Sequence, residues 1–472
     1  MWPLLQEAQK AGDIENSLTI YRSLSHLLKQ QMGPAALEML SRLSHEPIAA
    51  LHIADTPSPP PSSSITSAPK RVAYLLNYAL PQVTNGYTLR AQAISNALKH
   101  HGIDLVCLTR PGFPLDRSPP QAFRPVDQVD GIAYLHEALP ILDTFSNFST
   151  YLTAATNALE VRLRSIRPHA VVAASNFQIA LPSLIAARRL GLPFYYEVRG
   201  FWELTQLAAN PSIETTLFYQ LQHALECRVA RHANHVFTLA PSMREELQRR
   251  GVASRQISLV PNGCDTKKFS PQPRNIALAA HYNIPADVPV IGYIGSLVQY
   301  EGLDDLIHAC TLLQARDLDF RLLLVGSGPA ENSILEVAAN SRLEEKLILL
   351  GRIPHEEVEA HYSLIDIAPF PRKSQRVTEL VPPLKPLEAM AMEKAVIVSS
   401  VRPLADMILN NKTGLVFKKN DTEDLARTIV QLISDPDLRV RLGRAGRVWV
   451  ETERNWKTTT APIAKIVTEL MG

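Results

Sequence analysis

The residues with the clearest chemical potential lie in a basic, proline-rich loop that leads into a short helix. Arg372, Arg376 and Lys385 are the cations of this basic loop. Pro386 suits the first turn of a helix because it has no N–H to lose. Free N–H groups at a helix start, beside cations, favour a phosphate or diphosphate. Glu388 can accept hydrogen bonds from hydroxyl groups such as those of a ribose. The loop is therefore a candidate nucleotide site, and the alternative is a solvated charged loop before an ordinary helix.

The surrounding pattern of strands and helices decides where this loop lies. Short apolar segments rich in β-branched residues alternate with helical stretches, which is typical of a parallel, doubly wound sheet. The first expected series of strands is Val72–Leu76, Leu105–Leu108, Ala170–Ala173, Phe194–Val198, Val236–Leu239 and Ile257–Val260. The second is Val290–Ile294, Leu322–Val325, Leu347–Leu350, Ile367–Phe370, Val396–Ser399 and Leu415–Phe417. Two consecutive Rossmann-like domains are predicted, with a ligand-binding cleft at the carboxyl ends of their strands.

Composition shifts divide the chain into segments. We expect a helical N-terminal extension over 1–54, a Pro/Ser-rich linker over 55–70, a first Rossmann-like domain over 71–275 completed by a helix over 455–472, and a second Rossmann-like domain over 276–454. The extension is expected to be a packing or interaction arm. The linker cannot bury a core.

Bulk composition narrows the class of protein. The 472 residues are 46% hydrophobic and 20% charged, as in soluble globular proteins. The formal net charge of +2 is too small to predict a nucleic-acid partner. Four widely spaced cysteines favour a reduced compartment and no structural zinc. We expect no signal peptide and no spanning helix, so that any membrane contact would be peripheral.

Further polar loops follow other expected strands. Gly86 precedes a helix and would let the backbone approach a ligand, although a simple turn is an even alternative. Glu197, Arg199 and Trp202 form a polar-aromatic cluster suited to a sugar, with a structural salt-bridge cluster as the alternative. In the second series, a glycine-rich turn begins at Gly295 and opens a helix. A similar later turn, Gly-Ser-Gly-Pro, is predicted to be structural.

The order of several segments closely resembles glycosyltransferase family 4, whose members have the GT-B fold. The matching segments are His235–Leu239 with the helix that follows, Val260–Asp265, and Pro386–Ala391, the distal half of the family's Glu-x7-Glu region. The likeness runs from about residue 71 to the C-terminus. It implies an α/β protein with two Rossmann-like parallel-sheet domains facing a central cleft. Sequences around Glu197, Tyr300 and Thr378 resemble the branch found with bacterial exopolysaccharide and exosortase systems.

The chain departs from the family pattern at several site positions. The family's usual glycine-loop Arg and the Lys after it fall at Ser296 and Glu301. The first Glu of Glu-x7-Glu falls at Leu380, with Glu379 one position early, and the usual His falls at Arg199. These changes would fit an inactive protein. We expect compensation instead, because the basic loop can supply positive charge to phosphate oxygens.

The resemblance, carried onto the matching positions, implies a set of site residues. Catalytic roles fall to Lys385, Arg199, Glu379 and Arg376. Donor-binding roles fall to Gly295, Ser296, Arg352, Ile353, Arg372, Leu384, Lys385, Leu387 and Glu388. Gly86, Glu197 and Trp202 would face the acceptor. The base would lie against the backbone near Arg352, Glu388 would bind the ribose, and Lys385 would meet the diphosphate.

The implied activity is a retaining, metal-independent hexosyltransferase. It would move a sugar from a UDP- or GDP-sugar to a glycan or lipid-linked acceptor in bacterial cell-surface polysaccharide biosynthesis. No cofactor beyond the donor substrate and no nucleic acid is expected. The expected location is the cytoplasm, with room for peripheral contact at the inner face of the membrane and for a protein partner on residues 1–54. The alternative is an inactive GT-B scaffold subunit. A GT-B epimerase or phosphorylase fits the segment order less well, and a dehydrogenase lacks the full dinucleotide fingerprint.

Overall fold

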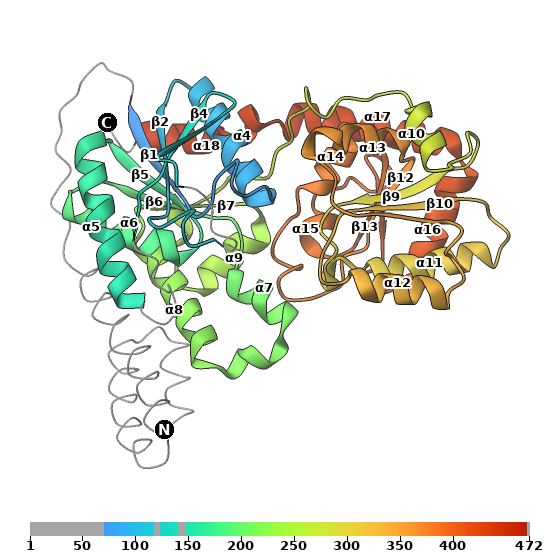
Figure 1. Ribbon diagram of the computed structural model, residues 1–472, viewed down its shortest axis with the longest axis horizontal. Helices are drawn as coiled ribbons and strands as arrows, with labels where there is room; N and C mark the ends of the chain where they lie inside the picture. The colour runs from blue at the N-terminus through green and yellow to red at the C-terminus, as the bar shows by residue number, and fades with distance from the viewer. Residues whose placement is uncertain (1–69, 118–122, 140–147, 470–472) are drawn as a thin grey trace, which may run out of the picture. The chain divides into compact units, whose positions relative to one another are not determined.

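The computed structural model describes residues 70–117, 123–139 and 148–469. These residues form two compact units (Figure 1). Unit 1 comprises the described residues up to Thr238, Arg244–Leu259, and the described residues from Pro462 onwards; unit 2 comprises Leu239–Met243 and Val260–Ala461. The predicted helical extension, and the predicted linker except Lys70, lie outside the described residues.

Unit 1 is built on a sheet whose strands, within the described residues, run in the order β3-β4-β2-β1-β5-β6-β7-β8. The strands are β1 (Arg71–Leu76), β2 (Asp104–Thr109), β3 (Val126–Val129), β4 (Ile132–Leu135), β5 (Ala170–Ala174), β6 (Phe194–Val198), β7 (His235–Thr238) and β8 (Ile257–Leu259). All pairs are parallel except β3–β4. The central strands β5 and β6 are buried throughout, which explains their nearly continuous apolar sequence.

Helices connect the parallel strands of unit 1. They are α4 (Gly86–His100), α5 (Phe148–Ile166), α6 (Phe177–Arg189), α7 (Trp202–Ala209), η1 (Pro211–Thr215), α8 (Leu217–His232), α9 (Pro241–Arg249) and η2 (Ser254–Gln256). Figure 1 shows α5 beside α6, and α6 also packs on β5, β6 and α8. Asn85 caps α4 by accepting hydrogen bonds from the backbone of Tyr87 and Thr88. The cap fixes the start of α4 just beyond the end of β1.

Unit 2 is built on a sheet with strand order β11-β10-β9-β12-β13-β14, and every printed pair is parallel. The strands are β9 (Val290–Ile294), β10 (Arg321–Val325), β11 (Leu347–Leu350), β12 (Ile367–Phe370), β13 (Ala395–Ser399) and β14 (Leu415–Phe417). The order reverses between β9 and β12, and this is the switch point where doubly wound sheets bind ligands.

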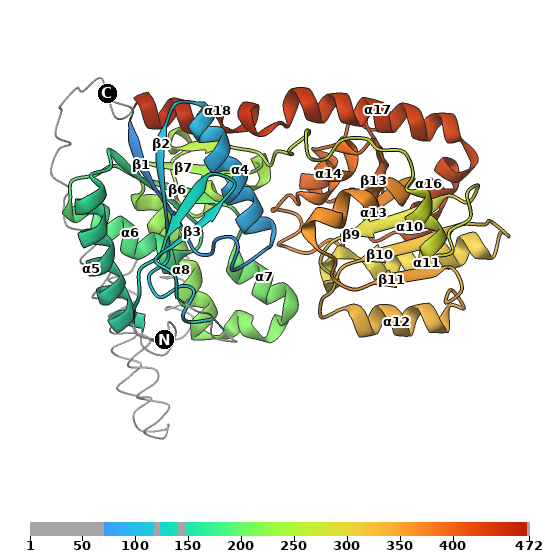
Figure 2. The ribbon, with the colours of Figure 1, turned by 45° about the horizontal axis from the view of Figure 1, so that its top comes forward.

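The helices of unit 2 cover both faces of this sheet. They are α10 (Ile276–His281), η3 (Gln299–Glu301), α11 (Leu303–Gln314), α12 (Glu331–Asn340), η4 (His355–Glu357), α13 (Val358–Leu364), α14 (Lys385–Ala391), α15 (Arg402–Ala405), α16 (Thr422–Ser434), α17 (Pro436–Glu453) and α18 (Trp456–Glu469), the last of which continues into unit 1. On one face α11 packs against α12 and α16, and on the other α14 packs against α17 (Figure 2).

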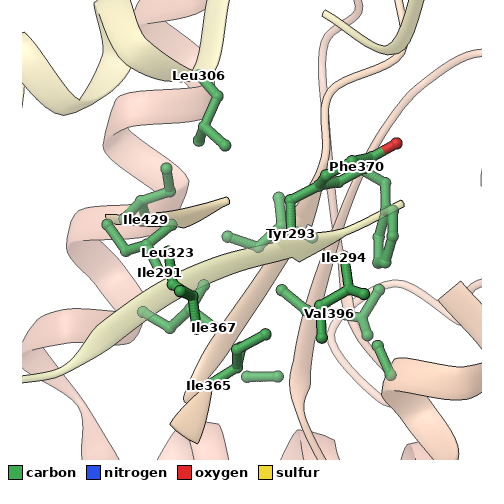
Figure 3. Close-up of a cluster of buried hydrophobic side chains, with 14 of the residues drawn as sticks. Ile291, Tyr293, Ile294, Leu306, Leu323, Ile365, Ile367, Phe370, Val396 and Ile429 are labelled. Atoms are coloured by element: carbon green, nitrogen blue, oxygen red, sulfur yellow. The ribbon is translucent and has the colours of Figure 1, made fainter. Parts of the chain in front are cut away.

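The core of unit 2 surrounds β9. Figure 3 shows Ile291, Leu323 and Ile367 gathered along this strand. Gly292 lies in the middle of β9, where an added Cβ would stand 3.2 Å from Ile365 Cγ2 and closer still to the rest of that side chain. The close packing fixes the carboxyl end of β9, and the candidate site begins there.

The strands predicted from the sequence are present in both units, and the two Rossmann-like sheets are confirmed. The hairpin of β3 and β4 was not predicted. No helix in the described part of the chain is long and apolar enough to cross a bilayer.

Candidate functional site

The carboxyl end of β9 continues into a glycine-rich turn that carries the first site residues. Gly295 has φ = +156°, a backbone conformation that favours glycine. Its N–H donates to the Val325 carbonyl at 2.8 Å, so this amide is already used within unit 2. Ser296 follows and is exposed. Of the two backbone amides expected to meet a diphosphate, the one on Ser296 is the better placed.

Three charged side chains meet beside this turn. Glu301 accepts hydrogen bonds from Arg372 Nη2 at 2.8 Å and Nε at 3.2 Å, and from Lys385 Nζ at 3.1 Å. Lys385 Nζ also donates to the hydroxyl of Tyr293 at 2.5 Å. We call Glu301, Arg372 and Lys385 the charged triad. It joins the end of η3, the loop after β12 and the first residue of α14.

The members of the charged triad differ in exposure. The side chain of Glu301 is 3% exposed, that of Arg372 10%, and that of Lys385 19%. Burial alone would raise the pKa of Glu301, but the two cations outweigh it and hold that pKa at about 2. Burial lowers the pKa of Lys385, and Glu301 counteracts this effect. Lys385 is thus the member of the charged triad with most surface open to a ligand.

The side chain of Lys385 runs directly over Gly295. A Cβ on Gly295 would collide with Lys385 Cε and lie 2.7 Å from Cδ and 2.8 Å from Nζ. Real Cβ contacts essentially never fall below about 3 Å. A glycine is therefore favoured here for two reasons: its positive φ, and the lysine side chain that would have to move to make room for a Cβ.

Glu388 lies in the same helix as Lys385 and is half-buried. Burial raises the pKa of its carboxyl to about 7, although Lys385, Lys268 and the hydroxyl of Tyr362 lower it. Such a group changes its charge close to neutral pH. It can accept hydrogen bonds from hydroxyl groups when it is ionised.

Glu379 and Arg376 occupy the outer part of the basic loop. Glu379 accepts hydrogen bonds from Ser374 and Lys419, both at 2.6 Å, and from the backbone of Arg402 at 3.1 Å. Burial opposes ionisation of Glu379, but these donors outweigh it and lower its pKa. Arg376 is exposed. The structure holds Glu379 in a network of its own, apart from the charged triad.

The other predicted donor residues differ in what they can offer. Arg352 follows β11 and is exposed, and Ile353 beside it is half-buried against the core. Leu384 is the half-buried cap residue of α14. The side chain of Leu387 is fully buried, so Leu387 packs in the core and has only its backbone to offer a ligand.

In unit 1, Glu197 is fully buried at the end of β6. Arg90 and Arg199 donate to its carboxylate at 3.0 and 2.9 Å, and the Tyr74 hydroxyl donates at 2.5 Å. Burial opposes ionisation, but the two arginines hold the pKa of Glu197 at about 2. Arg199 also donates to the carbonyl of Tyr87 at 2.9 Å. Glu197 therefore orients Arg199 and ties β6 to α4. A contact of Glu197 with a ligand stays a prediction.

Trp202 belongs to an aromatic surface in unit 1. Its ring stacks on that of Tyr78, with centroids 6.0 Å apart and planes 24° apart. Tyr87 lies edge-on to Tyr78, and all three side chains are half-buried. Gly86 is exposed at the first position of α4. Flat, partly exposed rings beside an open backbone suit a ligand with apolar faces.

The sequence did not predict the contacts that organise the charged triad in unit 2 and the ion pairs of Glu197 in unit 1. Tyr293 and Glu301 were not predicted as site residues, nor was Arg90. One signal was available: Glu197 lies inside a strand of otherwise apolar residues, and a buried carboxylate requires a cation. Among the described residues, no three His, Cys, Asp or Glu side chains come together as ligands for a metal ion.

Two protein-family models match the chain. The model described as "Glycosyl transferase 4-like domain" matches residues 85–263, and "Glycosyl transferases group 1" matches residues 277–449. The chain carries the two domains of a GT-B glycosyltransferase of the family 4 type. The predicted family is confirmed at this level, and the exopolysaccharide branch stays a prediction.

The chain has moderately similar curated relatives. A GDP-mannose-dependent alpha-(1-6)-phosphatidylinositol monomannoside mannosyltransferase of Mycolicibacterium smegmatis is 29% identical over 217 residues, which cover 45% of this chain and 56% of that protein. A glycogen synthase of Mycobacterium tuberculosis is 24% identical over 399 residues, covering 82% of this chain and 91% of that protein. The chain spans a little over half the length of the first curated relatives that it matches.

Solved structures share the fold of this chain. Sucrose-phosphate synthase from Thermosynechococcus elongatus has a TM-score of 0.69 at 20% identity, covering 85% of this chain and 99% of that chain. Anabaena HepE in complex with UDP and glucose has a TM-score of 0.65 at 13% identity, covering 85% and 100%. At these identities the likeness concerns the fold, and the predicted fold class is confirmed.

Proposed function

We propose that this glycosyltransferase moves a sugar from a nucleotide diphosphate sugar to a glycan or lipid-linked acceptor, with retention and without a metal ion, in bacterial cell-surface polysaccharide biosynthesis. One observation carries the proposal: the partly exposed ammonium of Lys385 lies over the glycine turn at the end of β9. Glu388 lies three residues further along the same helix. A cation and a hydroxyl acceptor at this spacing suit a nucleoside diphosphate.

The donor would be held mainly by unit 2. Lys385 and the Ser296 amide would bind the diphosphate, Glu388 the ribose, and the backbone around Arg352 and Ile353 the base. The relative from M. smegmatis is named for GDP-mannose, and HepE was solved with UDP. These names support a UDP- or GDP-sugar as the donor, and both bases belong in the test.

The charge that develops on the leaving group explains the need for Lys385. The bond between the anomeric carbon and the diphosphate oxygen breaks while a bond to the acceptor oxygen forms. Negative charge grows on the diphosphate, so a fixed cation stabilises the transition state more than the ground state. In the front-face account favoured for the family, the departing diphosphate takes the acceptor's proton. The catalytic contributions of Arg376, Glu379 and Arg199 belong to this proposal.

The acceptor would be bound by the first Rossmann-like domain, 71–275, and the donor by the second, 276–454. The aromatic surface of Tyr78 and Trp202 supports an acceptor with flat apolar faces, such as a sugar ring. The relative from M. smegmatis acts, by its name, on a phosphatidylinositol mannoside. That name supports a lipid-linked acceptor. A lipid-linked acceptor would bring the protein to the inner face of the membrane as a peripheral protein.

Ligand-induced stabilisation tests the donor assignment. Wild-type protein and Lys385→Met are heated with increasing UDP or GDP, because a ligand at one hundred times its Kd stabilises the native state by about 2.7 kcal/mol. We expect one nucleotide to raise the wild-type Tm and the effect to be much reduced in Lys385→Met. Equal stabilisation of both proteins would refute the role of Lys385.

A second candidate function is an inactive scaffold subunit of a polysaccharide assembly. The observation in its favour is that the positions of the two usual diphosphate cations hold Ser296 and Glu301. Slow release of free nucleoside diphosphate from a bound donor sugar would favour the enzyme. Tight binding with no release, across a panel of glycan and lipid-linked acceptors, would favour the scaffold.

A further inference from the structure

Glu301 is a buried carboxylate at a position where the family resemblance places a lysine. We propose that Glu301 is a positioning residue, which holds the Lys385 ammonium charged and aimed at the donor diphosphate. This inference rests on the proposed function and names a residue of the same site. On this inference, Glu301 is a working part of the site, although the family's phosphate-binding lysine is absent from its position.

The backbone around Glu301 is rigidly placed. Glu301 ends the short helix η3, and Gly302 follows in the left-handed conformation with φ = +73°. A Cβ on Gly302 would collide with the carbonyl oxygen of Pro371. The chain can therefore press against the loop after β12, which brings the Glu301 carboxylate to Arg372.

Both carboxylate oxygens of Glu301 are in use. Oε2 accepts from Arg372 Nε, and Oε1 accepts from both Arg372 Nη2 and Lys385 Nζ. With 3% of its side chain exposed, Glu301 has almost no surface for a ligand. Its effect on a ligand must pass through its partners.

Lys385 is the partner that can transmit this effect. Arg372 is 10% exposed and also donates to the carbonyl of Val381 at 3.0 Å, which anchors it within the loop. Lys385 is 19% exposed and is aligned from two sides, by Glu301 and by the hydroxyl of Tyr293.

The charges around Lys385 predict how nucleotide binding should depend on pH when Glu301 is removed. The charged groups that act on Lys385 are Glu301, Arg372 and Glu388, and the neutral Tyr293 hydroxyl touches it. Burial and Arg372 lower the pKa of Lys385, whereas Glu301 raises it. Without the charge of Glu301, the lysine would lose its proton at a lower pH. While both cations stay charged, however, the charged triad would carry two positive charges in place of one and attract a diphosphate at least as strongly.

The test is the pH dependence of nucleotide binding in Glu301→Gln. We expect its Kd for UDP or GDP, relative to wild type, to be equal or lower at about pH 6 and clearly raised at about pH 9, because Lys385 without the charge of Glu301 loses its proton at a lower pH. Titration of Glu388 and of the nucleotide itself occurs in both proteins and cancels in the ratio. A residue needed only for folding would weaken binding at every pH.

Asp304→Asn is the matched control. Asp304 lies in the first turn of α11, close to Glu301 in the sequence, and pairs with Lys373 at 2.5 Å, as Glu301 pairs with Lys385. Its removal should leave the Kd ratio flat across the pH range. In the double variant Glu301→Gln/Lys385→Met, the pH-dependent loss should vanish, because the group through which Glu301 acts is gone.

Separate outcomes distinguish this inference from the proposed function. If wild type binds no nucleoside diphosphate, both are overturned. If Lys385→Met weakens binding but Glu301→Gln shows a flat ratio, the inference is overturned and the proposed function stands. If Glu301→Gln does not fold, Glu301→Asp decides. It keeps the charge near Lys385, so a Kd ratio that stays close to one supports the inference, and equal weakening at every pH overturns it.

Discussion

The fit of Lys385 over Gly295 leads to a prediction for Gly295→Ala. The new Cβ would collide with Lys385 Cε and come within 2.7 and 2.8 Å of Cδ and Nζ. Because these nearest atoms all belong to one flexible side chain, the lysine must give way. Its ammonium would then leave the Tyr293 hydroxyl at 2.5 Å and the Glu301 carboxylate at 3.1 Å.

The size of the effect of Gly295→Ala follows from two contributions. A non-glycine residue at φ = +156° costs about 1–3 kcal/mol of stability. Displacing a charge-assisted hydrogen bond costs about 1.5–3 kcal/mol more. We expect nucleotide affinity to fall roughly tenfold, which corresponds to about 1.4 kcal/mol. Calorimetric titration with UDP or GDP and chemical unfolding measure the two quantities separately.

Gly102→Ala is the matched control for Gly295→Ala. Gly102 also has a positive φ, +79°, but no described atom lies within 4 Å of the Cβ that would be added. The control should lose stability through backbone strain and keep its nucleotide affinity. In a Lys385→Ala background, Gly295→Ala should cost only the strain and no further affinity, because the colliding atoms are absent. A folded Gly295→Ala variant with wild-type affinity would refute the role given to the lysine's position.

Three further predictions concern other titratable groups. Burial, with Glu203, raises the pKa of Glu226 from 4.5 to about 7, so the free energy of unfolding of the wild type should fall as the pH rises through this window. The Glu226→Gln variant should lack this fall and should be more stable than wild type at alkaline pH by up to about 3 kcal/mol, less the hydrogen bonds it loses. Urea unfolding at two pH values measures this difference. Because the pKa of Glu388 is about 7, the affinity of the wild type for UDP or GDP should rise between about pH 6 and 8 as this carboxyl ionises. The Glu388→Gln variant should bind the nucleotide more weakly and lack this rise. Identical pH profiles of affinity in the two proteins would contradict the ribose contact. Arg199→Lys should lower the free energy of unfolding by about 2–4 kcal/mol, because a lysine cannot keep both the hydrogen bond to buried Glu197 and the one to the Tyr87 carbonyl. An unchanged Tm would contradict this.

The strand segments were predictable because parallel strands buried on both faces have continuous apolar sequences. β9 and β13 have that character. The hairpin of β3 and β4 was not predicted from the sequence, because its strands have four residues each and are only partly buried. Its turn did leave a signal. Asp130 and Gly131, with φ values of +46° and +75°, are the Asp-Gly pair that two-residue hairpins favour.

The site was predictable only as a set of loops. Lys385 and Glu388 could be assigned from the loop and helix start in which they lie. Their partners could not, because Glu301 and Arg372 lie 71 positions apart in the sequence and meet only through the sheet. Exposure was equally hidden: nothing in the local sequence distinguishes the fully buried Leu387 from the half-buried Leu384.

The charged triad also bears on the position-by-position comparison with the family, which by itself favours an inactive protein. Glu301 without its cations would be an unpaired buried charge, which costs about 3–5 kcal/mol. Lys385 without a carboxylate would be a lysine whose burial and neighbouring Arg372 favour loss of its proton. Each change is costly alone and acceptable together. When a phosphate-binding lysine is missing from its usual position, lysines that the fold brings to the same strand end should therefore be considered as replacements. If Lys385 is such a replacement and depends on Glu301, the activity of Glu301→Gln should fall at alkaline pH; if it is not, the activity should not depend on this substitution in that way.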